Sequence, residues 1–204
     1  MRWTAFVGGV SMLVAGLSSV APAQSYRPAS GSSYSTGGYT VAIGTIALLR
    51  NPIDRALSHY QHEVRGGRES LSFEEALDRE PERLAGEEER LRADPGHYSY
   101  NHHRYSYLRR GLNLEQLLQW LRHFPRSQLL VLQSEWLFRD PPAASAAVYR
   151  FLGLSDHRLK QYKAFYQGSY ERTIPASLRT RLQAHFEAPN RELFRWLGEE
   201  FDWA

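Results

Sequence analysis

The stretch VAIGTIALLRNPIDRALSHYQHE, residues 41–63, joins a mainly apolar segment to an amphipathic one through a single arginine. Residues 41–49 are rich in β-branched and other apolar side chains, a composition typical of a strand buried on both faces. Asn51 and Pro52 then suit the N-cap and the first residue of a helix. The stretch therefore predicts a buried strand, Arg50 at its carboxyl end, and a helix directly after it.

Helical spacing gives the segment after Asn51 two different faces. The apolar side chains on one face are Ile53, Leu57, Tyr60 and Val64. The polar side chains on the opposite face are Asn51, Arg55, Ser58 and His62. Because ligands of open α/β sheets bind at the carboxyl ends of strands, Arg50, the first backbone N–H groups of the helix and Ser58 can surround an anion. The alternative is a capping arginine and a serine on an ordinary polar helix surface.

The remaining chain alternates helical patterns with one more short strand, expected at QLLVLQSE, residues 128–135. One helix is expected to begin at Ser72, where Ser72 and Glu75 suit a capping box. Further helices are expected at residues 114–121, at residues 143–153 and in two C-terminal segments separated by Pro189. The run of alternating charges at 78–92 is interpreted as a solvated helical face, and residues 96–111 as a loop. This alternation of strands and helices predicts an α/β fold with a parallel sheet.

Composition limits the function classes. The 204 residues are enough for one domain with a substantial core. The net charge of +3 is a weak argument for nucleic acid, and we expect no nucleic-acid partner. Lys160 and Lys163 are the only lysines, and the excess of arginine suits recognition of phosphate, sulfate or carboxylate. The chain has no cysteine, which excludes disulfides and a cysteine nucleophile. His102 and His103 are adjacent and lack a carboxylate partner, so we expect no metal site.

The first 40 residues differ in composition from the rest. Residues 1–25 have a basic start, an apolar middle and Ala21-Pro22-Ala23, the order of a secretory signal, and residues 26–40 are a Ser/Gly-rich linker. We therefore expect a signal-like segment, a linker and a domain over 41–204, with export or a secretory compartment as the location. The alternatives are a short apolar helix or a wrongly assigned start, which favours the cytoplasm. No later segment is long and apolar enough for a stable membrane span.

The segment LLRNPIDRALSHYQHE, residues 48–63, resembles the motif with which sulfotransferases hold the 3′-phosphate of 3′-phosphoadenosine-5′-phosphosulfate. In that motif an arginine ends a strand and a serine follows eight residues later, as Arg50 and Ser58 do. SHYQH is similar to the N-sulfotransferase domain of heparan sulfate N-deacetylase/N-sulfotransferases and to bacterial relatives. Later parts of the sulfotransferase sequence pattern are similar to two further segments, FPRSQLLVLQSEWLFRDP and RLQAHFEAPNRELFRWLGEEFDW. The resemblance therefore covers about residues 48–203.

The resemblance implies a three-layer parallel sheet flanked by helices, similar to P-loop nucleotide hydrolases. It implies a sulfotransferase that moves a sulfuryl group from 3′-phosphoadenosine-5′-phosphosulfate, its co-substrate, to a hydroxyl or amine, with a carbohydrate as the expected acceptor. Arg50 and Ser58 then bind the 3′-phosphate. His62 matches a histidine implicated in catalysis through the departing phosphate, and the alternative is a surface histidine. Gly168, Tyr170 and Arg172 match loosely a loop that covers the cofactor.

Two elements of the family find no match in this sequence. One is a lysine-containing loop that cradles the 5′-phosphosulfate, and the other is a glutamate that acts as base; no lysine precedes Lys160. The resemblance therefore predicts a fold truncated at its N-terminus. It leaves open a non-catalytic nucleotide- or glycan-binding remnant, or an exported glycan-binding protein. Five residues of one loop suit an acceptor surface for an anionic or hydroxyl-rich glycan, His102, His103, Arg104, Tyr105 and Arg109, and the favoured alternative is an ordinary polar loop. The acceptor and the oligomeric state stay open.

Overall fold

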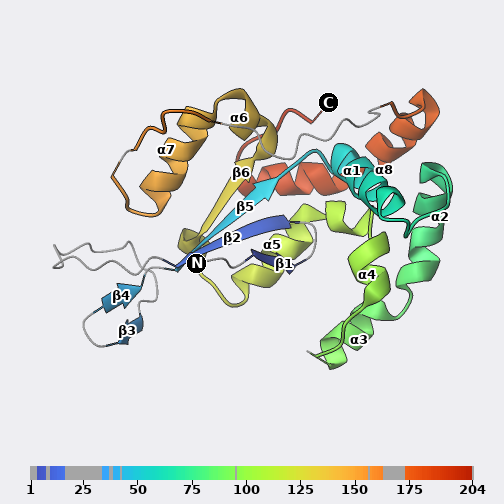
Figure 1. Ribbon diagram of the computed structural model, residues 1–204, viewed down its shortest axis with the longest axis horizontal. Coiled ribbons are helices and arrows are strands. Elements are labelled where there is room, and N and C mark those ends of the chain that lie inside the picture. Colours follow the sequence, from blue (N-terminus) through green and yellow to red (C-terminus); the bar gives the residue numbers. More distant parts are fainter. Residues whose placement is uncertain are drawn as a thin grey trace. The chain divides into compact units, whose positions relative to one another are not determined.

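A computed structural model describes residues 4–7, 10–16, 34–36, 39–41, 43–94, 96–155, 157–162 and 173–203. The chain divides into two compact units, each assembled from two separate stretches of sequence. One unit comprises residues 1–49 and 116–167, and the other comprises residues 50–115 and 168–204. The elements of each unit are coloured along the sequence in Figure 1.

The first unit is built on a four-stranded sheet in the order β1-β2-β5-β6. The strands are β1 (Thr4–Val7), β2 (Val10–Gly16), β5 (Ile43–Leu49) and β6 (Leu129–Gln133). The strands β5 and β6 lie side by side and run parallel, with Ala47 opposite Val131 (Figure 1). Both residues are buried, as the apolar run predicts. The two strands expected from the sequence are therefore confirmed, together with their parallel pairing.

Strands also form within the first 41 residues. The strand β2 pairs antiparallel with β5, and β1 pairs antiparallel with β2. A second sheet is the hairpin of β3 (Tyr34–Thr36) and β4 (Tyr39–Val41), which lies largely within the expected linker. The apolar segment is thus paired as strands instead of forming the short helix considered above. Its interpretation as a secretory signal stays a prediction.

In the first unit, one short 3-10 helix precedes β6 and two α-helices follow it. They are η2 (Arg126–Gln128), α6 (Ser134–Arg139) and α7 (Pro141–Phe151). The predicted helix is confirmed as α7, which ends at Phe151, two residues before the expected end at Gly153. Gly44 of β5 allows this helix to pack closely, because a Cβ atom there would lie 2.8 Å from the ring of Phe151. The strand pair therefore has a helix packed against it at Gly44.

The second unit consists of helices. They are α1 (Pro52–Arg65), α2 (Phe73–Leu84), α3 (Glu87–Ala93), α4 (Tyr100–Tyr105), η1 (Arg109–Gly111) and α8 (Ala176–Leu197). The helix α5 (Asn113–Leu121) begins in this unit and ends in the other. Apolar side chains of α1, α2 and α8 form one core with Tyr107: Ile53, Ala56, Leu57, Ala76, Leu77, Leu178, Leu182 and Phe186. The predicted packing face of α1 is therefore confirmed at Ile53 and Leu57.

Several expectations about this unit are wrong. The charged run 78–92 is not wholly solvated, because Glu80 and Glu87 are buried, and Val64 of the predicted packing face is 41% exposed. Residues 96–111 are not a continuous loop, because they contain α4 and η1; Ser99 caps α4 by accepting a hydrogen bond from the backbone N–H of His102 at 3.0 Å. The C-terminal region is one helix that continues through Pro189 instead of two. Its buried residues lie on both sides of the proline, so packing outweighs the single backbone hydrogen bond that proline removes. The predicted capping box of Ser72 and Glu75 is confirmed.

The described helices include none with the length and apolar character needed to cross a lipid bilayer.

Candidate functional site

The start of α1 is already capped by the chain itself. The Asn51 side chain accepts a hydrogen bond from the N–H of Ile53 at 2.9 Å, and its amide donates to the carbonyl of Trp203 at 3.3 Å. The Asn51 carbonyl accepts from the N–H of Arg55, and Pro52 has no N–H. Few backbone donors of the first turn are thus open to an anion. An anion at this junction depends mainly on side chains.

Arg50 and Ser58 are the side chains available for that role. Arg50 directly follows β5 and is half-buried, and Ser58 is half-buried on α1. Among the described residues, neither side chain has a hydrogen bond or an ion pair with another group. A guanidinium and a hydroxyl that are unpaired within the described part of the chain suit an external acceptor such as a phosphate oxygen.

Arg55 does not lie on an open face, contrary to the sequence prediction. Its guanidinium donates a hydrogen bond to the backbone carbonyl of Tyr107, while its buried Nε has no hydrogen-bond partner. Burial, followed by the charge of Arg110, lowers the pKa of Arg55 to about 9, and Glu80 partly opposes this shift. Asn51 is also buried. Only the later part of the predicted polar face, at Ser58 and His62, is accessible.

The surroundings of Arg55 carry more positive than negative charge. Arg50 and Arg110 both act on Arg55 as positive neighbours, and Glu80 is the one carboxylate among its principal electrostatic partners. Burial raises the pKa of Glu80, although the backbone N–H groups of Leu108 and Arg109 each donate to it at 2.7 Å. An anion bound near Arg50 and Arg55 would be stabilised by both guanidinium groups.

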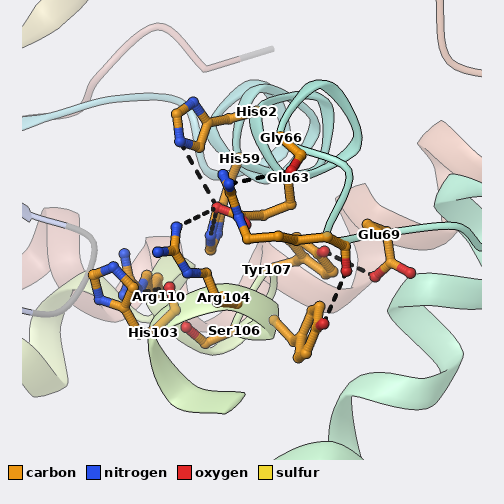
Figure 2. A network of polar contacts seen from close by, with 12 residues as sticks. His59, His62, Glu63, Gly66, Glu69, His103, Arg104, Ser106, Tyr107 and Arg110 are labelled. Atoms are coloured by element: carbon orange, nitrogen blue, oxygen red, sulfur yellow. Dashed lines mark hydrogen bonds and ion pairs between the residues drawn. The ribbon is translucent and has the colours of Figure 1, made fainter. Parts of the chain in front are cut away.

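His62 lies on the accessible side of α1, with 62% of its side chain exposed. Its Nε2 is 3.8 Å from Oε1 of Glu63, which is only 2% exposed (Figure 2). Glu63 accepts hydrogen bonds from Nε of Arg68 at 2.5 Å and from the guanidinium of Arg104 at 3.4 Å. Sequence reasoning missed Glu63, because Arg104 lies 41 residues away and only the fold brings it close. His62 can therefore meet a ligand with a buried carboxylate behind it.

His59 is largely buried, with 11% of its side chain exposed, and belongs to the packing of the unit. Burial, followed by the charges of Arg110 and Arg55, lowers the pKa of its imidazole to about 3. The ring meets the edge of Tyr107 at a centroid distance of 5.0 Å. Although Nε2 is 3.9 Å from Glu63, a neutral imidazole forms no ion pair there. The carboxylate of Glu63 is balanced by arginines.

The residues proposed for a glycan-facing surface have separate environments. His103 and Arg104 lie on α4 near Glu63 and His62 (Figure 2). Arg109 is instead paired with Glu88 and Glu115, and the Tyr105 hydroxyl donates to the carbonyl of Arg68 at 2.9 Å. Gly168, Tyr170 and Arg172 fall outside the described residues and stay predictions. The described part of the chain holds no cluster of three His, Cys, Asp or Glu residues that could bind a metal ion.

The sulfotransferase domain family matches residues 40–201, so the chain belongs to this family. It is 27% identical over 183 residues to heparan sulfate glucosamine 3-O-sulfotransferase 3B1 of Mus musculus, a match that covers 78% of this chain and 43% of that protein. It is 30% identical over 116 residues to bifunctional heparan sulfate N-deacetylase/N-sulfotransferase 2 of Bos taurus, covering 54% and 11% respectively. The chain thus spans less than half the length of these relatives.

A crystal structure of a sulfotransferase from Alicyclobacillus acidocaldarius has the same fold. The TM-score is 0.55 and the sequences are 32% identical, over 76% of this chain and 55% of that one. Together with the family match and the parallel β5–β6 pair, this likeness confirms the predicted sulfotransferase type of α/β fold.

Proposed function

We propose that the chain binds 3′-phosphoadenosine-5′-phosphosulfate and transfers its sulfuryl group to a hydroxyl or amine of a carbohydrate. The observation that carries this proposal is the pair Arg50 and Ser58, whose side chains have no hydrogen bond or ion pair with another described residue, with Arg55 close to Arg50. In this assignment Arg50 and Ser58 bind the 3′-phosphate through a charge-assisted and a neutral hydrogen bond. The positive charges of Arg55 and Arg110 add to the attraction of this site for an anion.

The reaction joins the acceptor oxygen or nitrogen to sulfur and breaks the bond between sulfur and the 5′-phosphate oxygen. The electron pair of that bond leaves with 3′-phosphoadenosine 5′-phosphate, and the proton of the acceptor hydroxyl or amine is released to solvent. Such transfers have loose in-line transition states, so positioning and stabilisation of the leaving group contribute most of the rate enhancement. His62 lies one helical turn beyond Ser58 and is exposed, and in this proposal it donates a hydrogen bond to the departing phosphate.

The proposed acceptor is a carbohydrate, because several relatives carry names that refer to heparan sulfate. A second candidate is a non-catalytic protein that binds the nucleotide or a glycan. This candidate needs only the 3′-phosphate site at Arg50 and Ser58 and no group that takes part in sulfuryl transfer. The two candidates share the 3′-phosphate site and differ in turnover.

The test compares 3′-phosphoadenosine 5′-phosphate with adenosine 5′-phosphate by titration calorimetry. We expect the wild type to bind the first ligand more tightly, and Arg50→Ala to weaken its binding by about 1.5–3 kcal/mol, because a hydrogen bond to a charged group is lost. Ser58→Ala is expected to cost about 1 kcal/mol. Arg139→Ala, which changes an exposed arginine at the end of α6, is the matched control and should have no effect.

Equal affinities of wild type and Arg50→Ala for the bisphosphate would contradict the proposed site. Transfer of labelled sulfate to a panel of oligosaccharides then separates the two candidates. Transfer that is lost in His62→Ala supports the enzyme, whereas tight nucleotide binding without transfer supports the binding protein.

A further inference from the structure

Two aromatic rings are exposed at the start of α4, those of Tyr98 just before the helix and of Tyr100, its first residue. Tyr98 is 63% exposed and Tyr100 is 47% exposed. Each ring has a nitrogen-bearing neighbour: the His103 ring lies 5.7 Å from that of Tyr98, and the Arg104 guanidinium lies 6.0 Å from the centre of the Tyr100 ring. A single exposed aromatic residue is common on protein surfaces. Two exposed tyrosines with a guanidinium nearby form a surface suited to a flat, partly polar ligand.

This surface is held rigidly on the rest of the second unit. Ser99 caps α4, and Tyr105 at its end donates a hydrogen bond to the backbone of Arg68 at 2.9 Å. The guanidinium of Arg83 lies over the Tyr105 ring at 4.1 Å, a favourable cation–π contact. The backbone that carries Tyr100 and Arg104 is therefore fixed before any ligand arrives, which lowers the entropic cost of binding.

The buried carboxylate of Glu63 brings this surface next to His62. The Oε1 atom of Glu63 lies 3.4 Å from Arg104 and 3.8 Å from His62, so both side chains gather around one oxygen (Figure 2). Glu63 also accepts from Arg68 through its second oxygen. Two arginines thus face one carboxylate, and the local charge is positive. A negatively charged ligand is favoured here over a neutral one.

We infer that Tyr100 and Arg104, held beside His62 by Glu63, bind one sugar ring of an acidic oligosaccharide. The inference rests on the proposed function and identifies residues for its acceptor. The Tyr100 ring packs against the apolar C–H face of the sugar, and Arg104 donates to a carboxylate or sulfate of the same or the next ring. Tyr98 extends the aromatic surface. The acceptor then lies next to His62, on the accessible side of α1.

Titration calorimetry without nucleotide tests the site, with a heparan sulfate hexasaccharide and uncharged cellohexaose as probes. We expect the charged probe to bind more tightly to the wild type. Tyr100→Leu should weaken both probes by a few-fold, because both sugars lose aromatic contact area. Arg104→Gln should weaken the charged probe roughly tenfold or more and leave the neutral one unchanged. Arg104→Lys, which keeps the charge but not the planar fork, should fall between.

The controls are Phe138→Leu, an exposed aromatic residue of α6, and Arg92→Gln, an exposed arginine of α3. Neither should change binding of either probe. The inference is overturned if the wild type binds neither probe, if Tyr100→Leu and Arg104→Gln bind both as the wild type does, or if a hexanucleotide of matching charge binds equally well. Thermal melting shows whether each variant is folded. The predicted binding pattern without sulfate transfer in a separate assay would contradict the proposed enzyme and retain the glycan site.

Discussion

At the scale of single residues, buried carboxylates organise the second unit. The side chains of Glu63 and Glu69 are almost fully buried, and each is held by an arginine through a contact of 2.5 Å. Glu69 also accepts from the Tyr107 hydroxyl at 2.9 Å and from the backbone N–H groups of Ser70 and Leu71. A buried carboxylate is tolerated only when it is paired and hydrogen-bonded. The arginines therefore contribute to stability through the carboxylates that they neutralise.

Replacement of Arg83 tests this point. Arg83→Ala leaves Glu69 buried without its cation, and we expect the free energy of unfolding to fall by roughly 3 kcal/mol, measured by urea denaturation. The matched control is Arg79→Ala on the same helix, because Arg79 pairs with Glu82 in an exposed position. That pair should contribute about 0–1 kcal/mol. Equal losses in the two variants would show that burial of Glu69 does not govern the effect.

The buried imidazole of His59 predicts a pH dependence of stability. Its pKa is lowered to about 3 in the folded protein, by burial and by the charges of Arg110 and Arg55. The unfolded chain binds a proton at this residue below about pH 6.5, and the folded chain does not until about pH 3, so stability is lost as the pH falls through that window. At pH 4.5 the loss from His59 is about 2–3 kcal/mol.

His59→Gln removes this titration and keeps a neutral polar side chain. We expect the variant to lose less stability than the wild type between pH 7.5 and pH 4.5, as measured by chemical denaturation at both values. The difference at pH 7.5 is the internal control, because it reports only the packing change. An identical drop in the variant and the wild type would mean that His59 is not the residue responsible.

At the scale of elements, local sequence signals predicted the strands and most helices. The apolar run before Arg50 and the Asn51-Pro52 cap are local, so β5 and α1 followed from the sequence. The helix α4 was missed because its residues are aromatic and basic, and its stability comes from the Ser99 cap and contacts with distant residues. The helix α8 was divided in two because a proline is a strong local signal, whereas the buried face that continues across it is tertiary.

Pro189 lies in the interior of α8. Within α8 it removes one backbone hydrogen bond, so Pro189→Ala should restore that bond and raise the free energy of unfolding by about 1–3 kcal/mol. Thermal and urea denaturation measure the change. Pro125→Ala, which changes a proline at the N-cap of η2, is the control and should not stabilise the protein comparably. A less stable Pro189→Ala variant would show that the local bend is needed to pack Phe186 and Leu193.

At the scale of the whole molecule, the site residues that are close together in the sequence could be predicted. The contacts that distant segments make with them could not. Arg50, Ser58 and His62 lie within thirteen consecutive residues, so their spacing was visible in the sequence. Burial of Arg55 depends on Tyr107, and the setting of His62 depends on Arg104, both far along the chain. Sequence spacing therefore identified the candidate ligands, whereas the charges behind them required the fold.

Binding of the nucleotide is expected to stabilise the folded chain. Arg50 directly follows β5 and precedes α1, so a ligand that Arg50 holds is expected to stabilise both elements. A ligand present at about 100 times its dissociation constant then stabilises the folded chain by about 2.7 kcal/mol, which raises the melting temperature by several degrees. In hydrogen exchange, 3′-phosphoadenosine 5′-phosphate should increase protection of β5 and β6 as well as α1. Adenosine 5′-phosphate at the same concentration, or the bisphosphate with Arg50→Ala, should do so much less. Protection confined to the second unit would show that the ligand does not stabilise β5, and equal protection by both nucleotides would contradict a 3′-phosphate site at Arg50.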